Sequence, residues 1–153
     1  MRSTFNLMNL AFSFILISLP LESFACKPYI PRIESYLQDG NTTAMVFVGT
    51  VTSIDLAQTF KDGVVYDVKM KATRWFVGDK RTEVIVRAYM STERSTDCAG
   101  IGQFRAEVGE QWFIFGDKFE TKLNPDTFNS RKIENGILPE DFRLRLEQNG
   151  IHF

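Results

Sequence analysis

The sequence predicts a mainly β fold, a partly open barrel of five short strands with two small flanking helices. From Val64 to Thr73, apolar and polar residues alternate with a period of two, as in a strand with one face buried and one face in water. Two turn signals, Asp62-Gly63 and Gly78-Asp79, interrupt runs of β-forming residues. Further apolar runs before and after these turns supply the remaining strands.

The strands are expected in the following order. Residues 45–51 form a nearly continuous apolar first strand. The second strand follows the Asp62-Gly63 turn, and the third is expected at residues 84–89. Residues 112–115 are apolar on both faces, which predicts a central fourth strand. A weaker fifth strand is expected around residues 119–123 or 128–133.

Two helices flank these strands. Before the first strand, apolar residues recur at helical spacing, and a proline limits where the helix can start: Ile30, Pro31, Ile33, Tyr36 and Leu37. After the last strand, Pro139 with two acidic residues marks a helix start, and Asn149-Gly150 marks its end. Phe142 and Leu146 lie one turn apart on this helix. These elements favour a barrel of the oligonucleotide/oligosaccharide-binding (OB) type, with a β-sandwich as the alternative.

Residues 1–25 have the organisation of a secretory signal peptide. Arg2 precedes an apolar stretch, Pro20 follows it, and Ser23-Phe24-Ala25 fits the small-x-small rule for cleavage. The stretch is shorter than the roughly 20 apolar residues that a membrane-spanning helix needs. An uncut membrane anchor is therefore the less favoured alternative. We expect cleavage after Ala25, export to the periplasm or the medium, and no membrane segment in the mature protein.

A lipid anchor on Cys26 is a second alternative. Bacterial lipoprotein signals usually carry Leu three residues before the cysteine and a small residue two before it, whereas Ser23 and Phe24 stand at these positions. Cleavage after Ala25 would leave residues 26–153, or 153 − 25 = 128 residues, which suits a single domain. The loss of Arg2 and Glu22 keeps the net charge at −1. Without a basic surplus, nucleic acid is not an expected partner.

Cys26 and Cys98 are the two cysteines of the chain, and both lie in the mature part. Two cysteines in an exported protein most simply form one disulfide. Closing this 72-residue loop (98 − 26) is worth about 4 kcal/mol if the bond acts through chain entropy. The bond would also tie the first mature residue to the middle of the fold.

The sequence contains no pattern that predicts an enzyme or a cofactor. His152, its one histidine, is next to last, and there is no H-E-x-x-H, G-x-S-x-G or phosphate-loop motif. Cys98 could act as a nucleophile only if it were free. Acidic pairs such as Glu107/Glu110 and Glu140/Asp141 are typical of a solvated surface. We therefore expect a binding or inhibitory protein.

Four stretches resemble a known family in their order and spacing: "VFVGTV" (46–51), "YDVKM" (66–70), "AYMSTERSTDCAG" (88–100) and "WFIFGDK" (112–118). Together with a mature N-terminal cysteine, they resemble the inhibitory domain of the tissue inhibitors of metalloproteinases and its bacterial netrin-like relatives. The resemblance extends over roughly residues 26–133. It implies a five-stranded OB-type barrel, in agreement with the strand pattern.

The resemblance also implies a mechanism. In this family the first cysteine is disulfide-bonded to a cysteine like Cys98, and its α-amine and carbonyl oxygen chelate the catalytic zinc of a target metalloprotease. Cys26 would then be the zinc ligand, through backbone atoms, and Lys27 would enter the primary specificity pocket of the target. The rest of the inhibitory wedge would be formed by Pro28, Arg94, Ser95, Thr96 and Asp97.

The sequence departs from the family at several positions. The family begins Cys-x-Cys, but Pro28 replaces the second cysteine, and its later partner is absent from "FNSRKI" (128–133). Lys27 is long and charged where animal inhibitors carry a smaller residue, so a target would need a different pocket. The C-terminal module of the animal proteins is missing.

Two functions are therefore kept. The first is an exported inhibitor of a zinc metalloprotease whose identity the sequence does not name. The second is a non-inhibitory module that binds protein or glycan, with Cys26 only as a disulfide staple. The second function would require exposed, clustered aromatic side chains, and the candidates are Tyr29, Trp75, Phe76 and Phe104.

Overall fold

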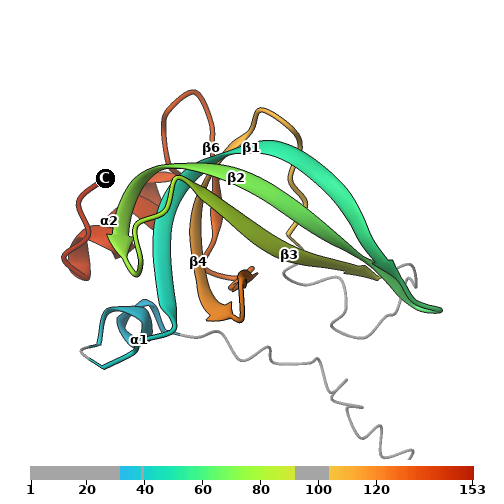
Figure 1. Cartoon of the computed structure of the whole chain (residues 1–153). Helices are drawn as coiled ribbons and strands as arrows, with labels where there is room; N and C mark the ends of the chain where they lie inside the picture. Colours follow the sequence, from blue (N-terminus) through green and yellow to red (C-terminus); the bar gives the residue numbers. More distant parts are fainter. Residues whose placement is uncertain (1–31, 39, 92–103) are drawn as a thin grey trace, which may run out of the picture.

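The computed structural model describes residues 32–38, 40–91 and 104–153. These residues form a β-barrel, with one short helix before its first strand and one after its last strand (Figure 1). The elements, in chain order, are α1 (Ile33–Leu37), β1 (Ala44–Thr59), β2 (Gly63–Val77), β3 (Glu83–Ser91), β4 (Gln111–Phe119), β5 (Lys122–Pro125), β6 (Arg131–Ile133) and α2 (Glu140–Gln148).

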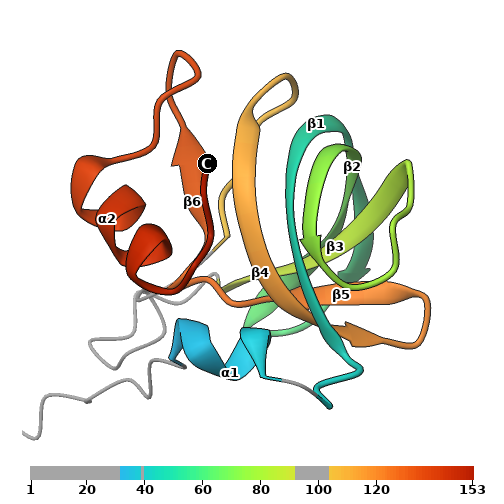
Figure 2. The ribbon, with the colours of Figure 1, turned by 90° about the vertical axis from the view of Figure 1, so that its left-hand side faces the viewer.

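Five strands close into a ring in the order β1-β2-β3-β5-β4, because β4 also pairs with β1 (Figure 2). The β1–β4 junction runs from Ala44↔Asp117 to Thr50↔Gln111, whereas β3 and β5 meet at a single parallel pair, Val86↔Leu123. The sixth strand, β6, pairs with residues 111–113 of β4, whereas β5 pairs with residues 116–119. The predicted five-stranded, OB-fold-like barrel with two small helices is confirmed.

The predicted elements are found where the sequence placed them, with two differences in length and number. β1 and β2 run on to Thr59 and Val77, well beyond their apolar centres. Register shifts, typical of bulges that bend a strand, occur in β1 between Val51 and Ser53 and between Leu56 and Gln58. Both positions considered for the weak fifth strand are strands, β5 and β6.

Glycines permit two close approaches of backbone in the ring. A Cβ on Gly49 would lie 2.9 Å from the ring of Phe47 and 3.2 Å from the carbonyl oxygen of Lys71. A Cβ on Gly116 would lie 2.4 Å from the carbonyl oxygen of Asn124. Both glycines lie inside strands, where a missing side chain allows the neighbouring backbone to come this near.

The core has two parts because β1 and β4 bury both of their faces. Val46, Val48, Phe113 and Phe115 pack against the helices, together with Phe142 and Leu146 of α2. The interior of the barrel is filled by the other face of the same strands and by β2, β3 and β5, with Phe47, Met70, Val86, Ile114 and Leu123. This double burial explains the continuous apolar sequences of β1 and β4.

Polar contacts fasten both helices to the turn before β6. The hydroxyl of Tyr36 in α1 donates to Oδ2 of Asp126 at 3.0 Å. Oδ1 of Asp126 accepts from the backbone amides of Phe128 and Asn129. Arg145 of α2 donates to Oδ1 of Asn129 at 3.1 Å. One buried carboxylate therefore organises the turn and anchors α1, and Asn129 extends this network to α2.

In the described part of the chain, neither helix has the length and apolarity to cross a membrane.

Candidate functional site

The residues of the predicted inhibitory wedge lie outside the described residues. They are Cys26, Lys27, Pro28, Arg94, Ser95, Thr96 and Asp97, and Cys98, the predicted disulfide partner, falls in the same undescribed range as the last four. The predicted signal peptide, residues 1–25, also lies outside. The structure therefore describes the scaffold from which these segments leave, and the wedge itself stays a prediction.

The residues that follow the first undescribed segment, and those on both sides of residues 92–103, are paired or buried in the fold. α1 starts at Ile33, and two of its side chains, Ile33 and Tyr36, are buried in the core beside the helices. β3 stays paired to its end, at Gly63↔Ser91. The chain resumes at Phe104, which is only 3% exposed and packs edge-on against Trp112, with 4.8 Å between ring centroids.

Glu110 fixes the stretch between Phe104 and β4. Its Oε2 accepts from the backbone amide of Glu107 at 2.9 Å and from Nε1 of Trp112 at 3.0 Å, while Oε1 pairs with Lys132. Burial acts to raise the pKa of Glu110, but the bonds from Lys132, Glu107 and Trp112 outweigh it and hold this pKa below its ordinary value. The carboxylate is therefore charged and fully engaged as a structural group.

Of the aromatic residues proposed for a binding platform, the three that the structure describes are buried or half-buried. Trp75 packs on Phe47 and donates from Nε1 to the carbonyl oxygen of Arg81 at 2.9 Å. Phe76 stacks on Phe113 with 5.1 Å between centroids. Phe104 is buried, and Tyr29 lies outside the described residues. The three described aromatics do not form an exposed cluster.

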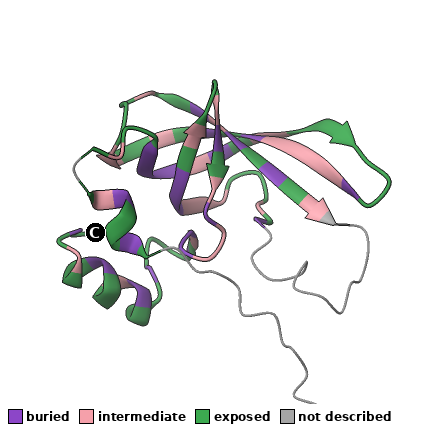
Figure 3. Ribbon diagram, turned by 90° about the horizontal axis from the view of Figure 1, so that it is seen from below, coloured by how far each residue is buried: buried purple, intermediate pink, exposed green. Residues whose placement is uncertain are grey.

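A protruding hairpin is the feature that the sequence analysis missed. We call residues 53–66, the distal parts of β1 and β2 with their turn, the arm. Figure 3 shows its strands mostly exposed or half-buried. Leu56 is 61% exposed and Phe60 is 44% exposed. The Asp62-Gly63 turn located the hairpin, but no signal in the sequence showed that Leu56 and Phe60 would be exposed.

Within the described part of the chain, the arm presents one strand edge with which no other strand pairs. β1 pairs with β4 up to Thr50, and Val51 still exchanges hydrogen bonds with the backbone of Gly109 and Glu110. Beyond Val51, β2 is the only described strand that pairs with β1. A free edge can accept an extended segment from another molecule.

Charged side chains of β1, β2 and β3 form ion pairs with one another and with Lys122 of β5. Asp55 and Asp67 lie directly opposite each other in the β1–β2 register. Lys69 binds Asp55 at 2.9 Å, and the hydrogen bond between them lowers the pKa of this carboxyl. Asp67 pairs with Lys122, and its Oδ1, which has no hydrogen-bond partner among the described residues, lies 3.7 Å from Nε of Arg87. The negative charges of Asp55 and Asp67 on this face are thus balanced by neighbouring cations.

No group of three or more histidine, cysteine or acidic side chains within residues 32–38, 40–91 and 104–153 is arranged to hold a metal ion. The chain was also compared with known proteins. No family model, no curated protein and no solved structure matches it. The resemblance to the metalloproteinase inhibitors consequently rests on the sequence motifs and on the barrel.

Proposed function

We propose that this protein is an exported inhibitor of a zinc metalloprotease and that the backbone amine and carbonyl of Cys26 ligate the zinc of the target. One observation carries the proposal. Three of the four motifs that resemble the inhibitor family meet in the barrel: residues 46–51 pair with residues 66–70 at Val51↔Met70 and with residues 112–118 at Val46↔Phe115. The first three residues of the fourth motif, 88–90, lie in β3 beside β2.

The chemistry of the proposed ligand suits a catalytic zinc. Such a zinc has three protein ligands and one exchangeable water. An α-amine nitrogen and the carbonyl oxygen of the same residue form a five-membered chelate that can replace this water. The amine must lose its proton, and its reference pKa of about 7.7–8.0 makes this inexpensive near neutral pH. A disulfide between Cys26 and Cys98 would order the chelate before binding and reduce the entropy lost on docking.

The scaffold supports this use of the terminus. α1 begins seven residues after Cys26 (33 − 26) and is fixed by the bond from Tyr36 to Asp126. Phe104 fixes the chain six residues after Cys98 (104 − 98). Both cysteines are thus close in sequence to buried residues of the described fold.

The decisive experiment adds one alanine before Cys26. This insertion removes the free amine of Cys26 and leaves the barrel, Lys27 and both cysteines in place. The proposal predicts that inhibition of a susceptible zinc protease falls by orders of magnitude while the melting temperature stays the same. Inhibition by the unextended protein should weaken as pH falls below the pKa of the amine, because the protonated nitrogen cannot bind zinc.

Lys27→Thr is the matched control. It changes the side chain proposed to enter the specificity pocket and keeps the amine, so it should alter which proteases are inhibited without abolishing inhibition. If the alanine-extended protein inhibits as well as the unextended one, Cys26 is a staple and the inhibitor proposal is wrong.

The exposed arm favours a second candidate, a module that binds an extended protein segment along β1. Leu56 and Phe60 supply exposed apolar surface beside the edge of β1 that pairs with no described strand. A photo-crosslinking amino acid at position 27 or at position 56 separates the two candidates. The inhibitor yields protease adducts from position 27, whereas the module yields adducts from position 56 and none from position 27.

A further inference from the structure

The tripeptide Asn-Gly-Ile occurs twice in the chain, at residues 135–137 and at residues 149–151. In an Asn-Gly pair, the backbone nitrogen of the glycine can attack the side-chain amide of the asparagine. Glycine permits this approach because it has no Cβ and has wide freedom of φ and ψ. The two copies have the same reacting residues and the same following residue, so a difference in their reactivity must come from the fold.

The first copy forms the tip of the hairpin turn between β6 and α2. The backbones of Glu134 and Ile137 exchange both hydrogen bonds, at 3.0 and 2.9 Å, so Asn135 and Gly136 are a two-residue turn. Their φ angles are 53° and 77°, and a type I′ turn requires positive φ at both positions. Both residues are exposed, and a Cβ on Gly136 would meet no atom within 4 Å. Figure 2 shows this turn projecting beside α2.

The reacting groups of this turn are not held by hydrogen bonds. Within the described part of the chain, neither the side chain of Asn135 nor the backbone N–H of Gly136 bonds to another residue. The side chain can therefore rotate over the following peptide without first breaking a bond. The next side chain, that of Ile137, is 69% exposed, so packing does not restrain this end of the turn either.

The second copy ends α2, and its reacting groups are held. The backbone N–H of Gly150, the attacking group, donates to the carbonyl oxygen of Glu147 at 3.0 Å. Nδ2 of Asn149, the leaving group, donates to the carbonyl oxygen of Arg145 at 2.9 Å. The next residue, Ile151, is buried. A Cβ on Gly150 would also meet no atom within 4 Å, so the two copies differ in hydrogen bonding and packing rather than in open space.

We propose that Asn135 is a site of spontaneous deamidation in the folded protein and that the end of α2 protects Asn149. The backbone nitrogen of Gly136 loses its proton to water or hydroxide and bonds to Cγ of Asn135. The Cγ–Nδ2 bond breaks, and Nδ2 takes up a proton and leaves as ammonia. Water then opens the resulting cyclic imide, at Cγ to leave aspartate or at the backbone carbonyl carbon to leave isoaspartate. One water is consumed and one ammonia is released, and no oxidant or reductant takes part.

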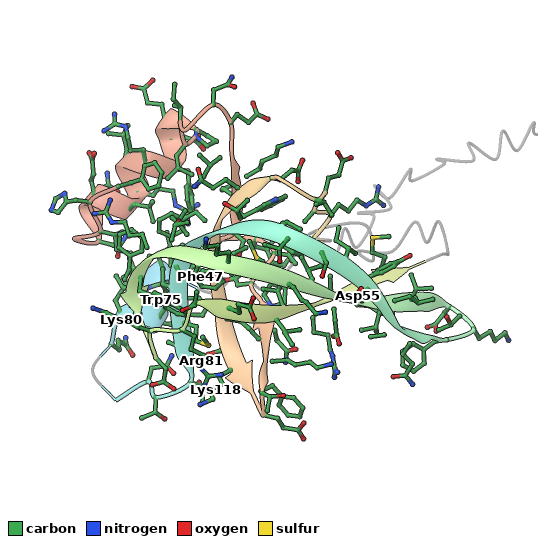
Figure 4. The ribbon with its side chains drawn as sticks, turned by 45° about the horizontal axis from the view of Figure 1, so that its top comes forward. Phe47, Asp55, Trp75, Lys80, Arg81 and Lys118 are labelled. Atoms are coloured by element: carbon green, nitrogen blue, oxygen red, sulfur yellow. The ribbon has the colours of Figure 1, made fainter. Side chains whose placement is uncertain are left out.

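The modification changes the turn and leaves the barrel intact. Isoaspartate adds a methylene to the backbone, so the two-residue turn loses its geometry and the bonds between Glu134 and Ile137 are lost. Directly after the turn, Leu138 is buried in the core and holds the chain in place. The turn lies at the opposite end of the molecule from Arg81 and Lys118 (Figure 4). We therefore expect the modified protein to remain folded.

The test follows both copies in one experiment, in which the folded full chain is kept in a mildly alkaline buffer for several weeks. Trypsin cleaves after lysine and arginine, so digestion places Asn135 in the peptide 133–143 and Asn149 in the peptide 146–153. Deamidation replaces NH₂ by OH, which a mass spectrometer detects, and chromatography separates the aspartyl and isoaspartyl forms. We expect the peptide 133–143 to react about five- to a hundredfold faster, because the second copy must first open two hydrogen bonds.

Unfolding supplies the matched control. In guanidinium chloride neither copy is held by the fold, so the two peptides should react at similar rates. Gly136→Ala adds a Cβ beside the attacking nitrogen, and it should slow the reaction of Asn135 severalfold without changing that of Asn149. Circular dichroism shows whether this variant is folded, and the ratio of the two peptides in the unsubstituted protein keeps the test valid if it is not.

Three results would overturn the proposal. They are equal rates for the two peptides in the folded protein, a faster reaction of the peptide 146–153, and no reaction of the peptide 133–143 over a period in which the unfolded chain reacts. None of these measurements depends on Cys26, so this inference and the inhibitor proposal succeed or fail separately.

Discussion

The barrel body and the arm are built from the same two strands, yet they differ in what surrounds them. In the body, β1 has β4 on one edge and β2 on the other, and both of its faces are covered. Phe47, in this part of β1, is fully buried. In the arm, β1 keeps β2 but has lost β4, and Leu56 of the same strand is 61% exposed.

This difference teaches that the alternation of apolar residues defines a face of a strand but not whether anything covers it. β2 continues its period-two pattern from the body into the arm, where Tyr66 lies opposite Leu56. Full burial in β1 ends at Val51, where its pairing with β4 has ended, although Ile54 and Tyr66 still pack against the barrel interior as partly buried residues. We attribute the stability of the fold to the packing of the body and not to the arm, and the following predictions test that division in order of decreasing effect.

The largest effect is expected from Phe47→Ala. Its ring fills the interior of a closed ring of strands, which can hardly collapse around the cavity, so the free energy of unfolding should fall by about 3–5 kcal/mol. Leu56→Ala is the matched change in the same strand, and it should stay within about 0.5 kcal/mol because the side chain is exposed. Urea unfolding measures both. Equal losses would mean that the arm is packed in solution.

α2 is assigned to the body by Phe142, which is 1% exposed and lies 5.8 Å from the ring of Phe113. Phe142→Ala should cost about 3 kcal/mol, toward the lower end for such changes because the helix can move toward the cavity. Leu144→Ala, on the exposed side of the same helix, should cost much less. A small loss for Phe142→Ala in urea unfolding would indicate that α2 is detached from the barrel.

Removing a hydroxyl compares the two regions at the level of one hydrogen bond. Tyr36→Phe removes the buried donor to Asp126 and should cost about 1–2 kcal/mol. Tyr89→Phe removes an exposed bond of 3.3 Å to the carbonyl oxygen of Asp62 in the arm, and water can replace it. Its effect on thermal unfolding should be too small to measure. The account requires revision if Tyr89→Phe proves the more costly change.

The smallest effect concerns the boundary between body and arm, where Glu110 holds the loop that bonds to Val51. The pKa of Glu110 is lower in the folded protein than its ordinary value, so the folded state binds fewer protons than the unfolded state near that value. The stabilisation is present above the unfolded pKa and is lost as pH falls through the folded pKa. Glu110→Gln should therefore flatten the acidic side of a stability–pH profile, and Glu107→Gln, an exposed neighbour, should not. Equal profiles for Glu110→Gln and the unmodified protein would contradict this assignment.

The barrel could be predicted because the sequence signals for its strands, turns and helices are local. The alternation in β2, the turns at Asp62-Gly63 and Gly78-Asp79, and the Phe142/Leu146 spacing each depend on neighbouring residues. The closure of the ring at Val86↔Leu123 and the network around Asp126 join residues far apart in the chain, and no periodicity reports such contacts. The grouping of Arg81, Lys118 and Lys122 around one small cleft could not be predicted for the same reason, since these residues come together only after β5 pairs with β3 and β4.

The central claim is that the mature chain begins with Cys26 and that this residue is bonded to Cys98. The intact mass of the protein obtained by expressing the full chain, measured without and with reduction, tests this claim most directly. The account predicts a non-reduced mass for residues 26–153 that is lower than the reduced mass by two hydrogens, with no added lipid. An acylated terminus, a different first residue, or two thiols that alkylate without reduction would contradict it.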